Sequence, residues 1–128
     1  MNRILVIDDN AEILNVVKLI LELHGYEVLT SGKGEETEND VIKYSPQLIL
    51  CDVYLKGSNG VEICNQLKSN KLTRNIPIIM FSAQVNDYLV FRKCAADDFI
   101  AKPFDNTVLL QKIEHLLKIS EGNEEARA

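Results

Sequence analysis

Short apolar runs alternate with amphipathic segments along this chain. The runs predict strands that are buried on both faces, at Arg3–Ile7, Glu27–Thr30, Leu48–Cys51, Ile76–Phe81 and Asp98–Ala101. The segments between them predict helices over Asn10–His24, Glu35–Tyr44, Asn59–Ser69, Val85–Ala95 and Asn106–Ser120. Strands that alternate with helices indicate one parallel sheet with right-handed crossovers and helices on both faces. The pattern predicts an α/β domain with a flavodoxin-like, doubly wound sheet of five strands.

Local signals mark the ends of two predicted helices. Gly25 follows the first helix and suits the left-handed turn that ends many helices. Asn59 and Glu62 resemble a capping box at the start of the third helix. The apolar residues of the first helix predict one broad buried face, made by Ile13, Val16, Val17, Ile20, Leu21 and Leu23.

Polar side chains stand where four of the predicted strands end. Asp8 and Asp9 follow the first strand, Asp52 the third, Ser82 the fourth and Lys102 the fifth. The carboxyl ends of parallel strands meet at one edge of a sheet, which is where open α/β folds place their ligand chemistry. Taken singly, each has an ordinary role: a solvated helix start, a turn, a helix cap or a surface lysine. Taken together, they predict a site.

The first loop favours a cation over an anion. Flavodoxins and dinucleotide-binding domains hold a phosphate there on backbone amides, whereas Asp8 and Asp9 would repel one. With Asp52 nearby, these carboxylates need a compensating charge. Hard oxygen ligands, few in number, suit Mg²⁺, which commonly bridges to phosphate.

These motifs resemble a known family. Asp8-Asp9, Asp52, Ser82-Ala83 and Lys102-Pro103-Phe104, in this order and spacing, are similar to the receiver domain of two-component response regulators. The resemblance extends from Arg3 to about Ile119 and implies a sheet with strand order 2-1-3-4-5. We therefore expect residues 1–120 to form the receiver domain, and residues 121–128 to be a polar tail or the start of a linker.

The resemblance also implies residue roles. Asp52 would be the phosphoryl acceptor, and Mg²⁺ would be bound by Asp8, Asp9, Asp52 and the backbone carbonyl of Tyr54. Ser82 would hydrogen-bond the phosphoryl group, and Lys102 would pair with it. Phe99 would be the switch aromatic, which turns inward on activation. The readout face, and a dimer interface in the phosphorylated state, would be made by Val85–Ala95, Asp98–Ala101 and Asn106–Ser120.

Three positions depart from the family pattern. Phe99 lacks a hydroxyl group, so its switch would work by packing alone. Lys56 takes the place of a common proline, and Ala96 that of a common glycine.

The function expected is Mg²⁺-dependent phosphoryl acceptance in a two-component phosphorelay. The donor would be a sensor histidine kinase, a phosphotransfer protein or a small phosphodonor, and the readout a downstream protein or the chain's own output domain. The alternative is a pseudo-receiver that binds proteins independently of phosphorylation. A haloacid-dehalogenase-type phosphatase usually has a second Asp where this chain has Tyr54, so we expect no enzyme beyond self-phosphorylation and autodephosphorylation.

Composition limits the partners and the location. With 14 basic and 19 acidic side chains the formal charge is −5, and no basic stripe suggests nucleic-acid binding. No apolar run approaches the roughly 20 residues of a membrane helix. Cys51, Cys64 and Cys94 form no CxxC pair, which fits thiols that act as core hydrophobes in a reducing cytoplasm.

Overall fold

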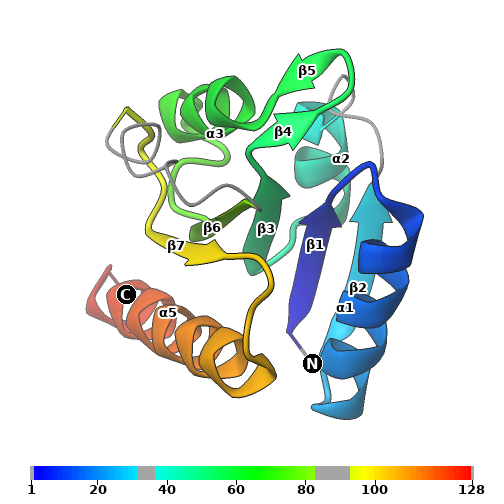
Figure 1. The fold of residues 1–128 in the computed structure, drawn as a ribbon. Coiled ribbons are helices and arrows are strands. Elements are labelled where there is room, and N and C mark those ends of the chain that lie inside the picture. The colour runs from blue at the N-terminus through cyan, green and yellow to red at the C-terminus, as the bar shows by residue number, and fades with distance from the viewer. Residues whose placement is uncertain (1, 32–36, 83–92, 128) are drawn as a thin grey trace.

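A five-stranded parallel sheet forms the centre of the molecule. The computed structural model describes residues 2–31, 37–82 and 93–127, with side chains to residue 122. The strands of this sheet are β1 (Arg3–Ile7), β2 (Glu27–Ser31), β3 (Leu48–Asp52), β6 (Ile78–Ser82) and β7 (Asp98–Ala101). Their order is β2-β1-β3-β6-β7, and every neighbouring pair is parallel (Figure 1). The predicted 2-1-3-4-5 order is confirmed.

Helices cover both faces of this sheet. On one face, α1 (Ala11–Leu23) and α5 (Asn106–Arg127) pack against one core cluster (Figure 1). On the other face, α2 (Thr37–Tyr44) and α3 (Gly60–Ser69) pack against a second cluster. β1, β3 and β6 lie between the two helical layers, which explains their runs of fully buried residues.

The Asn59 cap and the Gly25 turn agree with prediction, although no reciprocal bond from Asn59 to Glu62 occurs among the described residues, and the cap at Asn10 was not predicted. The Asn10 side chain accepts hydrogen bonds from the backbone N–H groups of Glu12 and Ile13, and Asn59 accepts one from Val61. Gly25 has a φ of 87°, the left-handed conformation predicted for it. The predicted helix Val85–Ala95 lies largely outside the described residues.

Several predicted boundaries differ from the structure by a residue or two, and the larger differences have physical reasons. The fourth strand begins at Ile78 because Pro77 has no N–H for the sheet. α5 continues past Ser120 to Arg127, a stretch with three Glu and one Ala, residues that favour helix. Val16 and Leu23 of α1 are exposed, because at 3.6 residues per turn they lie about 100° or more from the buried Val17.

A hairpin that the sequence did not predict follows β3. Its strands are β4 (Tyr54–Leu55) and β5 (Ser58–Asn59), which pair in antiparallel fashion. Gly57, with a φ of 72°, lies in the turn between them. The arrowheads of β1 and β3 point toward this hairpin, so it stands over the carboxyl edge of the sheet (Figure 1).

Candidate functional site

The predicted residues meet at the carboxyl edge of the sheet. Asp52 ends β3 and is in register with Phe81, one residue before Ser82. Ser82 ends β6 and pairs with Ala101, after which Lys102 leaves the sheet. The Lys102 backbone N–H donates to the Ser82 carbonyl at 2.7 Å. The strand ends thus bring together residues that lie up to 94 positions apart in the sequence.

Three carboxylates form what we call the acidic cluster: Asp8, Asp9 and Asp52. One oxygen of each lies within 4.8 Å of the others, and no other set of this kind occurs among the described residues. Asp8 is fully buried, Asp52 is 7% exposed, and Asp9 is exposed to solvent. Two of the three charges are therefore removed from most of the solvent, where their mutual repulsion is weakly screened.

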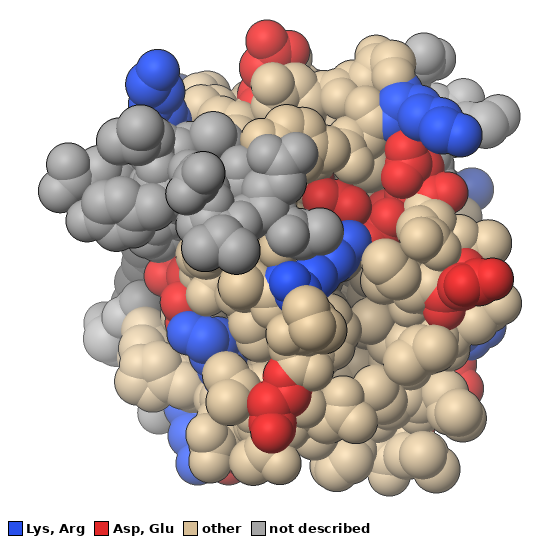
Figure 2. Space-filling view, viewed as in Figure 1, with Lys and Arg blue, Asp and Glu red and all other residues tan. Residues whose placement is uncertain are grey.

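Lys102 supplies the opposite charge. Its Nζ lies 2.7 Å from Asp8 Oδ2 and 2.9 Å from Asp52 Oδ2. The same ammonium stands over the Phe81 ring, 4.4 Å from the ring centroid, so an aromatic face also contacts the cation. Its side chain is only 11% exposed. Space-filling atoms show acidic and basic groups in direct contact on this side of the molecule (Figure 2).

Backbone N–H groups fix the orientation of each carboxylate. Asp8 accepts from the Asn10 N–H at 2.9 Å, and Asp52 accepts from the Tyr54 N–H at 3.1 Å. Asp9 accepts from the Lys56 N–H of the hairpin at 2.8 Å. A proline at position 56 would have no N–H to donate, so the Lys56 departure is what permits this last bond. Sequence reasoning missed the bond because it depends on backbone position.

Gly60 lets α3 approach Asp52. A Cβ built on Gly60 would lie only 1.9 Å from the Asp52 carbonyl oxygen. In addition, the Gly60 N–H donates to the Val53 carbonyl at 2.9 Å. The first residue of α3 must therefore be glycine for the helix to begin against the end of β3. Sequence reasoning treated Gly60 only as part of a helix start.

Burial raises the pKa of the Asp52 carboxyl above its ordinary value. The hydrogen bond from Lys102 and the N–H of Tyr54 act in the opposite direction and favour the charged form, while the Asp8 charge adds to the increase. Asp52 is therefore a partly desolvated carboxylate whose counter-charge comes from one lysine.

The remaining predicted residues lie on β6, on β7 and on the hairpin after β3. Ser82 is fully buried at the end of β6. Phe99, in β7, is half-buried and packs against the core cluster beneath α3. The Tyr54 side chain is 48% exposed, beside the backbone segment that leaves Asp52. The Lys102–Pro103 peptide bond is cis.

The donor set fits a divalent cation. The acidic cluster offers hard oxygen atoms at short mutual distances, with two of the carboxylates buried. Such a set has excess negative charge that one lysine only partly offsets, and Mg²⁺ prefers these ligands.

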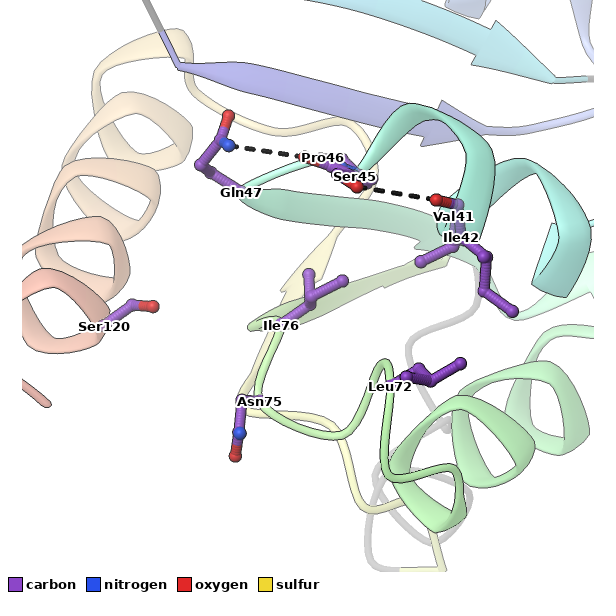
Figure 3. A pocket seen from close by; sticks show the side chains of 9 residues that line it. All are labelled: Val41, Ile42, Ser45, Pro46, Gln47, Leu72, Asn75, Ile76 and Ser120. Carbon is purple, nitrogen blue, oxygen red and sulfur yellow. Dashed lines mark hydrogen bonds between the residues drawn. The ribbon is translucent and has the colours of Figure 1, made fainter. Parts of the chain in front are cut away.

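A separate cavity lies at the opposite end of the sheet. It encloses about 430 Å³ and is shown in Figure 3. Its lining comes from α2, the segment before β3, the connection from α3 to β6, and α5: Val41, Ile42, Ser45, Pro46, Gln47, Leu72, Asn75, Ile76 and Ser120. None of these side chains is ionisable at neutral pH, so this cavity has none of the chemistry of the acidic cluster.

Comparison with known proteins agrees with this geometry. Residues 4–114 match the model of the response regulator receiver domain. The phosphate regulon transcriptional regulatory protein PhoB of Pseudomonas aeruginosa is 34% identical over 117 residues, which are 90% of this chain and 51% of PhoB. The alkaline phosphatase synthesis transcriptional regulatory protein PhoP of Bacillus subtilis is 34% identical over 93% of this chain and 50% of PhoP.

Solved structures show the same fold. The receiver domain of a signal transduction histidine kinase from Syntrophus aciditrophicus has a TM-score of 0.86 and 31% identity, over 92% of this chain and 91% of that one. The response regulator TrrA of Thermotoga maritima, solved with Mg²⁺ and beryllofluoride, has a TM-score of 0.83 and 29% identity, over 91% of this chain and 99% of that one.

The fold, the acidic cluster and the family match lead to one class. The chain belongs to the response regulator receiver domain family, and its role is in two-component phosphorelay signalling. As a receiver it is not an enzyme with a separate substrate, and its chemistry is limited to its own phosphorylation and dephosphorylation. The chain spans about half the length of the curated relatives it matches. Among the described residues, no helix is both long and apolar enough to cross a membrane.

Proposed function

We propose that Asp52 is the residue that accepts the phosphoryl group. The observation that carries this assignment is that Asp52 combines a contact with Lys102 Nζ, at 2.9 Å, with access to solvent, whereas Asp8, which also contacts Lys102, is fully buried. Asp52 would act as the nucleophile, and the Lys102 ammonium beside it would supply the positive charge that the transferred phosphoryl group requires. Of the three carboxylates in the cluster, Asp52 alone ends the strand at the centre of the sheet.

The same cluster would hold Mg²⁺, with the backbone carbonyl of Tyr54 completing the protein's ligands. When bound there, Mg²⁺ supplies positive charge to the oxygens of the phosphoryl group. The relative from Thermotoga maritima was solved with this ion and a beryllofluoride group, which supports the choice of metal.

The transfer step follows from these positions. An Asp52 carboxylate oxygen attacks the phosphorus of the donor, and the bond from phosphorus to the donor's leaving group breaks as the new P–O bond forms. Lys102 would leave its ion pair with Asp52 and pair with a phosphoryl oxygen. Ser82, in the neighbouring strand, would donate its hydroxyl hydrogen bond to another of these oxygens.

The new charge would then be transmitted along β6 and β7. Movement of Ser82 toward the phosphoryl group would allow Phe99 to repack, because the two residues lie on paired strands. The readout face would include β7 and α5, where Val108 and Ile119 are exposed apolar side chains. The third predicted part of this face, Val85–Ala95, lies largely outside the described residues.

The partners would be those of a cytoplasmic signalling pathway. The donor would be the phosphohistidine of a sensor kinase or a phosphotransfer protein, and acetyl phosphate would serve as a small donor. The readout would be a downstream protein, an output domain beyond this chain, or a second copy bound through the readout face. The relatives include a DNA-binding transcriptional regulator and the receiver domain of a histidine kinase. A receiver of this kind can therefore be one domain of a longer regulator or of a kinase.

Acetyl phosphate labelling tests the proposal. We would measure intact mass after incubation with acetyl phosphate, with Mg²⁺ and with a chelator, for the wild type, Asp52→Asn and Asp40→Asn. We expect one phosphoryl group on the wild type and on Asp40→Asn, only with Mg²⁺, and none on Asp52→Asn. The Asp40 variant controls for the loss of an acidic residue elsewhere, since Asp40 lies in α2.

Two results would reject the assignment. Labelling of Asp52→Asn at the wild-type rate would place the acceptor elsewhere. A folded wild type that takes up no label, and that also shows no Mg²⁺-dependent change with beryllofluoride, would favour the pseudo-receiver that only binds proteins.

A further inference from the structure

Cys64 and Cys94 lie in the same core cluster, between α3 and the sheet. Cys64, on α3, is fully buried, and Cys94, in the segment before β7, is partly exposed. The two thiols are near enough for hydrogen bonding between them to change the pKa of both. The fold therefore joins two thiols that the sequence separates by 30 positions.

Asn65, the residue after Cys64, forms hydrogen bonds with the backbone on both sides of Cys94. The Asn65 side chain donates to the Lys93 carbonyl at 3.4 Å and accepts from the Ala95 N–H at 3.0 Å. These two bonds hold the chain on both sides of Cys94. Asn65, which has no part in the acidic cluster, thus holds Cys94 beside the helix that carries Cys64.

The surroundings of Cys94 favour its thiolate. The hydrogen bond from Cys64 lowers the pKa of Cys94 to about 7, the Ala96 N–H and the Lys68 charge act in the same direction, and burial and Asp97 oppose them. Lys68 is itself held by Asp97 at 2.7 Å and by the Ile76 carbonyl at 2.8 Å. The partner thiol changes in the opposite sense, because its donated hydrogen bond and burial raise the pKa of Cys64.

We propose that Cys64 and Cys94 are a modification site, a thiol pair that a peroxide oxidises to a reversible intramolecular disulfide. This bond would join α3 to the segment that enters β7. Asp97 of that segment accepts from the Ile78 N–H at 2.8 Å, so the disulfide would also fasten the start of β6. In the reducing cytoplasm proposed for this chain, disulfides are usually transient and redox-sensing, and a reversible pair of this kind fits that setting.

The chemistry balances with hydrogen peroxide as the oxidant. The Cys94 thiolate attacks one peroxide oxygen, the O–O bond breaks, and Cys94 becomes a sulfenic acid while hydroxide leaves and is protonated to water. The Cys64 sulfur then attacks the Cys94 sulfur, the S–O bond breaks, and a second water leaves with the Cys64 proton. Two thiols are oxidised and one peroxide is reduced to two waters. A dithiol reductant reverses the step by thiol–disulfide exchange.

Cys51 belongs to the same core cluster but lacks the exposure and the lowered pKa of Cys94. It is fully buried in β3, its S–H contacts the Asp52 carbonyl at 3.4 Å, and burial raises its pKa. It therefore provides the matched control.

Peptide mapping tests the pair without any substitution. Trypsin places the three cysteines on three peptides, namely residues 44–56, 57–68 and 94–112. We would oxidise the folded wild type with hydrogen peroxide, alkylate the remaining thiols and map the digest without reduction. We expect a monomer that has lost two hydrogens, with peptide 57–68 joined to peptide 94–112 and Cys51 alkylated. Treatment with dithiothreitol should separate the two peptides.

Variants sharpen the result. Cys51→Ala should still form the cross-link, whereas Cys64→Ala and Cys94→Ala should not. If the wild type instead gives only sulfinic acid at Cys94, a disulfide that includes Cys51, or a cross-linked dimer, the proposal is wrong. The test uses neither a phosphodonor nor Mg²⁺, so its outcome is independent of the proposed function.

Discussion

At the scale of single residues, Lys102 determines the balance of charge in the site. One ammonium contacts two buried or nearly buried carboxylates, Asp8 and Asp52, and rests on the Phe81 ring. The Lys102 ammonium therefore has two roles. It would pair with a phosphoryl group, and in the unphosphorylated protein it stabilises the fold by neutralising buried carboxylates.

Removing that charge should destabilise the fold. We expect Lys102→Met to lower the free energy of unfolding by about 3 kcal/mol in Mg²⁺-free buffer, because it leaves two buried carboxylates without a partner. The double variant Lys102→Met/Asp52→Asn should recover part of the lost free energy of unfolding, because it also removes one of the two unpaired carboxylates. Urea denaturation followed by circular dichroism measures both. A change within about 0.5 kcal/mol, typical of surface substitutions, would contradict this account of Lys102.

The reactivity of Cys94 should depend on pH. Its pKa of about 7 predicts that the alkylation rate rises with pH and is half-maximal near pH 7, because only the thiolate reacts. An ordinary cysteine would show this midpoint near pH ~8.5. Iodoacetamide labelling, quantified on peptide 94–112, gives the profile. Cys64→Ala removes the donated hydrogen bond and should move the midpoint upward, whereas an unchanged midpoint would show that Cys64 does not set it.

At the scale of elements, the site depends on how α3 begins. The helix starts at Gly60 directly against the end of β3, and the hairpin β4–β5 between them carries the Lys56 N–H to Asp9. Strand ends could be predicted from apolar runs followed by Asp or Lys. The hairpin could not be, since Tyr54–Asn59 is short and has no alternating pattern.

Gly60→Ala should therefore be destabilising. A Cβ would meet the Asp52 carbonyl oxygen at 1.9 Å, so backbone must shift, at a cost of roughly 1–3 kcal/mol. Gly122→Ala in α5 is the control, because nothing lies within 4 Å of its Cβ and alanine favours helix by roughly 1 kcal/mol. Thermal unfolding should show opposite signs for the two substitutions. If both substitutions changed Tm equally, α3 would be able to move away from β3 without a loss of stability.

At the scale of the whole molecule, the pattern of apolar runs was sufficient for the fold class. The five strands and the two helical layers agree with that pattern, because period and burial leave few alternatives for a βα chain of this length. The strand order was predicted from the resemblance to receiver domains rather than from the pattern. The apolar pattern could not predict contacts between side chains that are far apart in the sequence. The pairing of Cys64 with Cys94, and of Lys102 with both Asp8 and Asp52, depends on register and rotamer, which a single sequence does not encode in any local pattern.

Mg²⁺ should stabilise the whole domain if the acidic cluster binds it. Ligands that bind only the folded state raise its stability, so we expect saturating Mg²⁺ to increase Tm by roughly 2–8 °C. Asp9→Asn should reduce the increase, and Asp40→Asn should retain it. Scanning fluorimetry in chelator-treated buffer provides the comparison. An equal increase in Asp9→Asn would place the bound cation elsewhere.

The central claim is that Asp52 accepts phosphate in a Mg²⁺-dependent step, and locating the label tests it most directly. The tryptic peptide 44–56 contains Asp52 as its only carboxylate, while Asp8 and Asp9 fall on peptide 4–18. After acetyl phosphate treatment with Mg²⁺, we predict a hydroxylamine-sensitive phosphoryl group on peptide 44–56, and none when Mg²⁺ is chelated. A label on peptide 4–18, or a label on peptide 44–56 that forms equally well without Mg²⁺, would contradict the account.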